Sequence, residues 1–213
     1  MWLQQTGSIA GVHDMVYPAD ELRSHHLALI VIGGSAGALD VLVDLLAALP
    51  RAFPAPVVVV VHLPADADGT FADLLRSKCS LAVAEAEDKL VPAVGGIYVA
   101  PADYHLLFER HGGMALSADR PVHYSRPSID VLFESAALAF GPRVLGILLS
   151  GASADGATGL ASIRNRGGLT WVQSPDSARV PLMPREALAL APHSTLTVEE
   201  MTRNLVDWGY AGA

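Results

Sequence analysis

The chain has 213 residues, of which 51% are hydrophobic and 17% charged, a composition that excludes a disordered protein. Its 14 basic residues against 22 acidic ones give a formal net charge of -8, which argues against a nucleic-acid partner and against docking on anionic lipid. A single cysteine, Cys79, excludes an intrachain disulfide and a cysteine-rich zinc site, and it indicates a reducing, cytoplasmic compartment.

The hydrophobic residues come in short runs, such as 27–32 and 57–61. Each run is far shorter than the roughly 18 residues that a membrane-spanning helix needs, and the N-terminus shows no signal-peptide pattern. We therefore expect no membrane insertion. Residues 1–25 have no periodic pattern and are predicted to be a tail, which leaves residues 26–213 as one domain.

From residue 27 onward, apolar runs alternate with amphipathic stretches. The predicted strands are 27–32, 56–62, 81–87, 95–101, 104–109, 114–117, 143–151 and 167–173. The predicted helices are 38–49, 70–76, 128–140, a helix that ends near 163, 184–191 and 198–208. This alternation predicts an α/β fold of three layers: a Rossmann-like, doubly wound, mostly parallel sheet with helices on both faces and an antiparallel hairpin at its edge.

Three predicted strands end in residues that can carry chemistry. Ser35 follows the first strand in a Gly33-x-Ser35-x-Gly37 setting, His62 follows the second, and Asp155 comes after strand 143–151. Because ligands of open α/β sheets bind at the carboxyl ends of the strands, these side chains are predicted to share one site. A serine, a histidine and an aspartate are the parts of a nucleophilic triad.

Each residue type has a role in such a triad. A serine hydroxyl is a weak nucleophile, so a histidine must take its proton, and a buried carboxylate then orients the histidine and stabilises the imidazolium. The flanking glycines allow a sharp turn from strand to helix. This turn places the amide of Ala36 at a helix N-terminus, where it is a candidate donor to the oxyanion.

Other interpretations stay open on the residues alone. Ser35 could cap the following helix or belong to a phosphate-binding turn, although the G-x-G-x-x-G pattern of dinucleotide sites is missing. His62 could be a structural histidine, and Asp155 could serve a turn or cap the next helix. Ser153 competes with Ser35 but lacks the flanking glycines. The order Ser35, His62, Asp155 also differs from that of lipase-like α/β-hydrolases.

Several stretches of the chain carry a family resemblance. They are IGGSAGALD (32–40), VHLPADADGTFADLL (61–75), EAEDKLVPAVGGIYVAPADYH (85–105), SRPSIDVLF (125–133), LLSGASADGATGL (148–160) and MPREA (183–187). In these the chain resembles the catalytic domain of the bacterial chemotaxis protein-glutamate methylesterases. The resemblance implies that Ser35, His62 and Asp155 hydrolyse methyl esters of glutamates on the cytoplasmic region of chemoreceptors. It also implies glutamine deamidation in many members, and neither cofactor nor metal.

The chain departs from the family pattern at Ala36, Ala38 and Ala152. These departures motivate an alternative hypothesis, a catalytically silent module that binds protein in a signalling assembly. Gly34, Ala36, Ala152 and Arg126 are candidate oxyanion or substrate-binding residues. Most family members carry a receiver domain, which needs about 100 residues or more, whereas about 25 precede the first strand here. A separate receiver protein is therefore a candidate regulator.

Three further polar positions have simpler predicted roles. Ser128 and Asp130 are expected to serve the N-terminus of the helix that begins there, and His105 is expected to be structural or to lie at the rim of the site. His25 and His26 have neither an acidic cluster nor a cysteine near them at the spacing of metal ligands, so a metal site is not predicted.

Overall fold

The structure is a computed structural model that describes residues 22, 24–62, 70–191 and 193–211. Its strands are β1 (Leu29–Gly34), β2 (Val57–Val61), β3 (Ala82–Glu85), β4 (Gly96–Val99), β5 (His105–Phe108), β6 (Met114–Ser117), β7 (Val144–Leu148), β8 (Leu169–Gln173) and β9 (Ser194–Leu196). Its helices are α2 (Leu39–Ala47), α3 (Thr70–Lys78), α4 (Ile129–Phe140), α5 (Ala157–Asn165), α6 (Leu182–Leu190) and α7 (Val198–Ala211).

In the described part of the chain, seven strands form one sheet in the order β3-β4-β2-β1-β7-β8-β9, and every neighbouring pair is parallel. From β1 the chain first builds the side of the sheet that holds β2, and it later crosses to the other side at β7. The switch point of the topology therefore lies between β1 and β7. At such a point the loops at the carboxyl ends of the strands diverge and leave room for a ligand.

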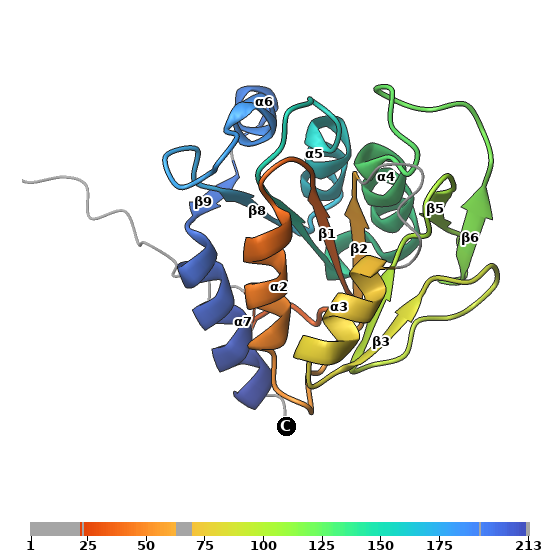
Figure 1. Ribbon diagram of the computed structural model, residues 1–213, viewed down its shortest axis with the longest axis vertical. Helices are drawn as coiled ribbons and strands as arrows, with labels where there is room; N and C mark the ends of the chain where they lie inside the picture. The colour runs from red at the N-terminus through yellow and green to blue at the C-terminus, as the bar shows by residue number, and fades with distance from the viewer. Residues whose placement is uncertain (1–21, 23, 63–69, 192, 212–213) are drawn as a thin grey trace, which may run out of the picture.

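Helices cover both faces of the sheet. Figure 1 shows α2, α3 and α7 on one face and α4, α5 and α6 on the other. Alternate residues of β1 pack into the two layers: Ile30 and Ile32 into the first, Leu29 and Val31 into the second. A strand that is buried on both faces needs apolar side chains at every position, which explains the uninterrupted apolar runs of the sequence.

The predicted fold class is confirmed: the sheet is doubly wound and lies between two helical layers. The hairpin, however, does not extend the sheet at its edge, because β5 and β6 pair with each other in a separate two-stranded antiparallel sheet. This hairpin is fastened to α4, where the N–H of Phe108 donates to the hydroxyl of Ser135 (3.0 Å). Strand β4, which precedes the hairpin in the chain, pairs in parallel with β2 and β3.

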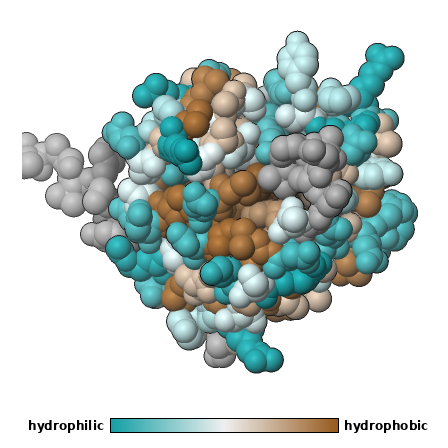
Figure 2. Space-filling model, viewed as in Figure 1, coloured by the Kyte–Doolittle hydropathy of each residue, from teal (hydrophilic) through white to brown (hydrophobic). Residues whose placement is uncertain are grey.

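Two predictions concern the ends and the surface of the chain. Most of the predicted tail, residues 1–21 and 23, lies outside the described residues, but Leu22 is fully buried in the hydrophobic cluster on the face of the sheet that α2, α3 and α7 cover. Figure 2 shows a hydrophobic area at the centre of the face that carries α2, α3 and α7, ringed by hydrophilic side chains. Among the described helices, none has the length and apolar character of a membrane span.

Candidate functional site

Ser35 follows β1 directly and stands in the tight turn that leads into α2. Its N–H donates to the carbonyl of Ser150 at the end of β7 (2.9 Å), and its carbonyl accepts from the N–H of Ala38 (3.0 Å). Ala38 begins α2 without any side-chain cap, so Ser35 is not the N-cap residue of that helix. The Ser35 hydroxyl has no hydrogen-bond partner among the described residues, which leaves it available for chemistry.

His62 is brought beside Ser35 by the register of β1 and β2. Gly34 and Val61 are Cα partners in this parallel pair. The next residues, Ser35 and His62, therefore follow the two strands at the same height along the sheet. The N–H of His62 donates to the carbonyl of Gly34 (3.1 Å), which continues the ladder by one residue. Neighbouring strands lie about 4.8 Å apart, so the two side chains emerge close together at the carboxyl end of the sheet.

Asp155 lies in the loop between β7 and α5 and is fully buried. Its Oδ1 accepts from the hydroxyl of Ser128 (2.7 Å) and the N–H of Asp130 (3.0 Å), and its Oδ2 accepts from the N–H of Ile129 (2.7 Å) and from Nε2 of His62 (2.7 Å). Burial works to raise the pKa of Asp155, but these hydrogen bonds outweigh it and lower the pKa below its ordinary value. The carboxylate therefore stays ionised.

The hydrogen bonds of His62 identify its basic nitrogen. Because the ionised Asp155 can only accept, Nε2 carries the ring proton of neutral His62, and Nδ1 has the free lone pair. Among the described residues, the hydrogen-bond partner of Nδ1 is the hydroxyl of Ser125, at 3.4 Å. No hydrogen bond joins Nδ1 to Ser35 within the described structure, and contacts of this kind often tighten only in the substrate complex.

The predicted oxyanion donors lie in two loops at this edge of the sheet. Ala36 follows Ser35 and is exposed, and Ala152 is exposed in the loop that carries Asp155. Neither N–H donates to a described residue. Gly34 is the last residue of β1, and its carbonyl accepts from the N–H of His62. These contacts hold His62 in place and do not indicate an oxyanion donor.

A second loop, residues 174–181, is anchored to the turn that carries Ser35. The buried hydroxyl of Ser150 donates to the carbonyl of Ala36 (2.8 Å) and accepts from the N–H of Val180 (2.9 Å). Gly37 has a positive φ of 78°, and a Cβ built there would lie 2.7 Å from the Cβ of Arg179. The side chain of Arg179 therefore rests on the turn, and only glycine fits beneath it.

Three predicted residues near the site have their polar groups engaged. The guanidinium of Arg126 donates to the carboxylate of Asp103 (2.6 and 3.0 Å) and to two backbone carbonyls, so its contacts favour a structural role over substrate binding. His105 is buried and accepts from the N–H of Ser128 (3.1 Å), as expected for a structural residue. Ser128 caps α4, as predicted.

The hydroxyl of Ser153, the other serine weighed as a nucleophile, accepts from the N–H of Asp155 (3.3 Å). It belongs to the local turn. Cys79 is half-buried, and burial raises the pKa of its thiol, so the group stays protonated and is a poor nucleophile.

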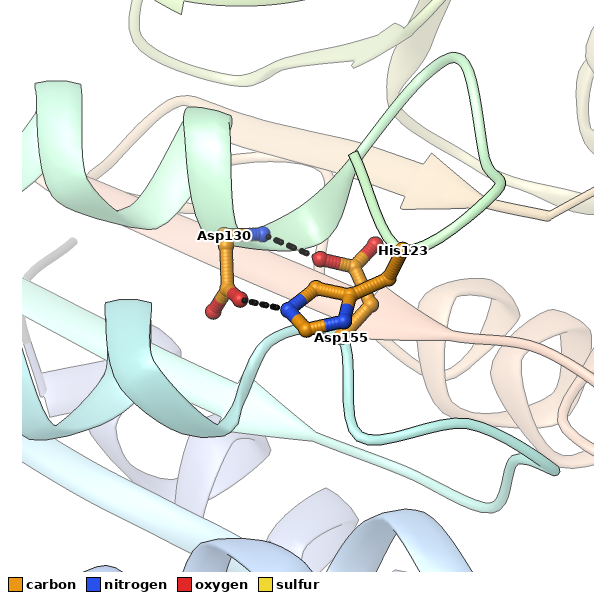
Figure 3. Close-up of side chains that lie close together, drawn as sticks. All are labelled: His123, Asp130 and Asp155. Atoms are coloured by element: carbon orange, nitrogen blue, oxygen red, sulfur yellow. Dashed lines mark hydrogen bonds and ion pairs between the residues drawn. The ribbon is translucent and has the colours of Figure 1, made fainter. Parts of the chain in front are cut away.

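His123, Asp130 and Asp155 present ligand atoms within 4.8 Å of one another, and Figure 3 shows how their side chains converge. A cation there would need free lone pairs on the carboxylates. Both oxygens of Asp155 already accept two hydrogen bonds each, and Oδ1 of Asp130 accepts from the N–H groups of Gly156 and Gly159. The donor set therefore forms an internal hydrogen-bond network and is poorly suited to hold a metal ion.

The sequence reasoning did not single out Ser125, His123, Ser150 or Arg179. Ser150 and Ser125 each adjoin a motif that was noticed, so a serine next to a strand end or next to the Arg-Pro-Ser block was the available signal. His123 and Arg179 carry no such signal. Their positions follow from turns that bring them back onto the site.

Relatives of the chain carry a consistent set of names. A protein of Leptospira interrogans with the provisional name protein-glutamate methylesterase/protein-glutamine glutaminase is 43% identical over 159 residues, which are 75% of this chain and 82% of that protein. The protein-glutamate methylesterase FrzG of Myxococcus xanthus is 38% identical over 181 residues, which are 84% of this chain but only 54% of FrzG. The chain thus spans about half the length of this second relative.

The fold and the family agree with these relatives. The catalytic domain of the Thermotoga maritima CheB methylesterase superposes with a TM-score of 0.80 at 28% identity, and the match covers 85% of this chain and 98% of that domain. The family model described as CheB methylesterase matches residues 30–205, which include every strand of the parallel sheet except the first residue of β1. The chain belongs to the CheB methylesterase family.

Proposed function

We propose that this chain is a serine esterase that removes the methyl group from glutamate γ-methyl esters, with Ser35 as nucleophile, His62 as general base and Asp155 as the residue that orients His62. The observation that carries this proposal is the 2.7 Å hydrogen bond between Nε2 of His62 and buried Asp155, at the end of a strand paired with the strand that leads into Ser35. A carboxylate on one ring nitrogen leaves the other nitrogen basic and aimed away from the core.

In the first half of the reaction, Oγ of Ser35 attacks the ester carbonyl carbon while its proton passes to Nδ1 of His62. The negative charge on the carbonyl oxygen is stabilised by backbone N–H groups, for which Ala36 and Ala152 are the candidates. The tetrahedral intermediate then breaks its bond to the methoxy oxygen. That oxygen takes the proton from His62 and leaves as methanol, and the glutamyl group remains as an ester on Ser35.

In the second half, a water molecule attacks the glutamyl ester of Ser35. His62 accepts the proton of the water and returns it to Oγ of Ser35, and the product is a glutamate carboxylate. The same acyl-enzyme forms from a glutamine side chain when ammonia is the leaving group. The glutaminase part of the Leptospira relative's name supports this second activity.

The rival hypothesis, a silent binding module, rests on the alanines at positions 36, 38 and 152. These substitutions remove side chains, whereas an oxyanion site uses backbone N–H groups, and the N–H groups of Ala36 and Ala152 remain free of internal acceptors. The contact between His62 and Asp155 is also intact. The names of the relatives favour an active enzyme as well.

The proposed substrate is the methylated cytoplasmic region of a chemoreceptor, so the proposed location is the cytoplasm. The family membership and the methylesterase names of the relatives support this choice. Regulation by a separate receiver protein stays a prediction.

Labelling with a fluorophosphonate tests the nucleophile, and methanol release from methylated receptor tests the substrate. We expect the wild-type protein to be labelled and to release methanol, and Ser35→Ala to do neither. Ser177→Ala is the control, since the hydroxyl of this exposed serine donates only to the carbonyl of Ser174 in its own loop. Equal labelling of Ser35→Ala and the wild type would contradict the proposal.

A further inference from the structure

Two buried carboxylates, one before α5 and one at the start of α4, each accept N–H groups from the first turn of the other helix. Asp155, just before α5, accepts the N–H groups of Ile129 and Asp130 at the start of α4. Asp130, at the start of α4, accepts with Oδ1 the N–H groups of Gly156 (2.9 Å) and Gly159 (2.7 Å) at the start of α5. Figure 3 shows the two carboxylates side by side. Neither can move without breaking bonds of the other, so Asp130 fixes the loop that holds Asp155.

A tight turn before α4 contacts both Asp130 and the catalytic histidine. Val122 and Ser125 exchange two backbone hydrogen bonds (3.1 and 2.8 Å), and His123 and Tyr124 between them both have positive φ values, 48° and 63°. This conformation is uncommon for residues other than glycine and asparagine. It directs Nε2 of His123 to Oδ2 of Asp130 (3.3 Å) and places the hydroxyl of Ser125 near His62.

Burial and, to a smaller extent, the negative charge of Asp155 together raise the pKa of Asp130 to about 6, against the lowering effects of the two glycine N–H groups and of His123. The other charged or titratable side chains around it are engaged elsewhere. His105 from β5 bonds to the N–H of Ser128, and Arg126 is paired with Asp103. Asp130 therefore changes its charge within the pH range in which an esterase works.

We propose that Asp130 is a positioning residue for the esterase reaction: its carboxylate holds the loop of Asp155, and its negative charge, added to that of Asp155, favours the imidazolium that His62 forms during catalysis. The inference rests on the proposed function. The ligand atoms of Asp130 and Asp155 lie within 4.8 Å of each other, and His62 bonds directly to Asp155. Asp130 is thus one contact away from His62, and a second negative charge beside Asp155 adds to the electrostatic stabilisation of the imidazolium.

Asp130→Asn separates the two contributions, because the amide oxygen still accepts from Gly156 and Gly159 while the charge is gone. Above pH 7 we expect kcat for methyl-ester hydrolysis to fall about tenfold, with KM changed less than about twofold. At pH 5, where wild-type Asp130 is protonated, the two proteins should differ by less than about twofold. Asp130→Ala loses the hydrogen bonds too and should be slower at every pH. Glu134→Gln, an exposed site one turn along α4, is the control and should match the wild type.

If kcat of Asp130→Asn falls by the same factor at pH 5 and pH 8, Asp130 has only a structural role and the proposal about its charge is wrong. If kcat does not fall at either pH, the whole proposal is overturned.

If Asp130→Asn does not fold, His123→Gln serves as the second test. Without the histidine the midpoint of the Asp130 carboxyl, followed by carbon-13 NMR, should move to higher pH, and kcat should fall only between about pH 5.5 and 7. An unchanged midpoint with unchanged kcat would overturn the proposal. Retained activity in Ser35→Ala would sink the proposed function instead, and it leaves these NMR midpoints readable.

Discussion

The two halves of the site differ in how firmly they are held. The acid–base half consists of a fully buried carboxylate, Asp155, with four hydrogen bonds, one of them to His62. The nucleophile half is a surface turn in which the hydroxyl of Ser35 and the N–H of Ala36 have no partner among the described residues. In the proposed reaction, the base is therefore organised before substrate arrives, while the proposed nucleophile and oxyanion donor keep their bonding capacity for the substrate.

Substituting the nucleophile should produce the largest loss of activity and almost no loss of stability. In Ser35→Ala we expect kcat to fall by about a thousandfold or more, because the proposed reaction loses the oxygen that forms the acyl-enzyme. The free energy of unfolding should change by less than about 0.5 kcal/mol, since the removed oxygen makes no internal hydrogen bond. Methanol release and urea unfolding measure the two quantities. A large loss of stability would show that the turn depends on the hydroxyl.

Substituting the acid should cost both activity and stability. In Asp155→Asn we expect kcat to fall about a thousandfold, because the amide no longer holds His62 in the right tautomer. We also expect the free energy of unfolding to fall by about 2–4 kcal/mol, since α4 loses part of its cap. Asp207→Asn, an exposed site on α7, is the control for the change of charge. If Asp155→Asn is as stable as the wild type, the contrast between the two halves fails.

The stability of the acid half should depend on pH through Asp130. Its pKa is about 6 in the folded protein and near 4 in the unfolded chain, so the stability it contributes is full below about pH 4 and is lost as pH rises through 6. Asp155 has the opposite sign, because its pKa is lowered and its contribution is lost only in acid. We therefore expect Asp130→Asn to exceed the wild type in unfolding free energy by about 1–2 kcal/mol at pH 8 and to match it near pH 4.

Urea unfolding at pH 4, 6 and 8 checks this expectation, with Glu134→Gln as the matched surface variant. A difference that does not grow with pH would show that Asp130 carries no strained charge. A gain in stability at pH 8 together with the loss of kcat described above would indicate that the protein keeps an unfavourable buried charge for the sake of the reaction.

The strand ends made the triad predictable. Buried parallel strands read as apolar runs, and the polar residue that follows each run lies at the ligand-binding edge whatever the details of the helices, so Ser35, His62 and Asp155 could be proposed as a triad from the sequence. The sequence also predicted the helix start at Ser128, from the polar residues that follow Pro127. It also predicted the order of helices and strands, apart from the three-residue strand β9, which is too short to leave a pattern.

The network behind the triad was not predictable in this way. Asp130 was expected to serve its own helix, but its carboxylate caps α5, and this exchange depends on how α4 and α5 pack against each other. The turn at His123 and Tyr124 lacks the asparagine–glycine signal that usually marks such a conformation. Only the folded chain shows that it returns to the site. Local sequence signals thus predicted the three residues of the proposed triad, and tertiary packing determined what supports them.

The smallest effect is expected at the contact that bridges the two halves. The hydroxyl of Ser125 lies 3.4 Å from Nδ1 of His62, which is long for an O–H···N hydrogen bond, and it occupies a direction that the nucleophile needs. In Ser125→Ala we expect kcat within about twofold of the wild type and full labelling by a fluorophosphonate, because the removed bond is weak and Ser35 remains. Labelling that persists in Ser35→Ala and disappears in Ser125→Ala would instead identify Ser125 as the nucleophile. The strand register would then have misled the assignment of Ser35, since a turn and not a strand end would carry the reactive group.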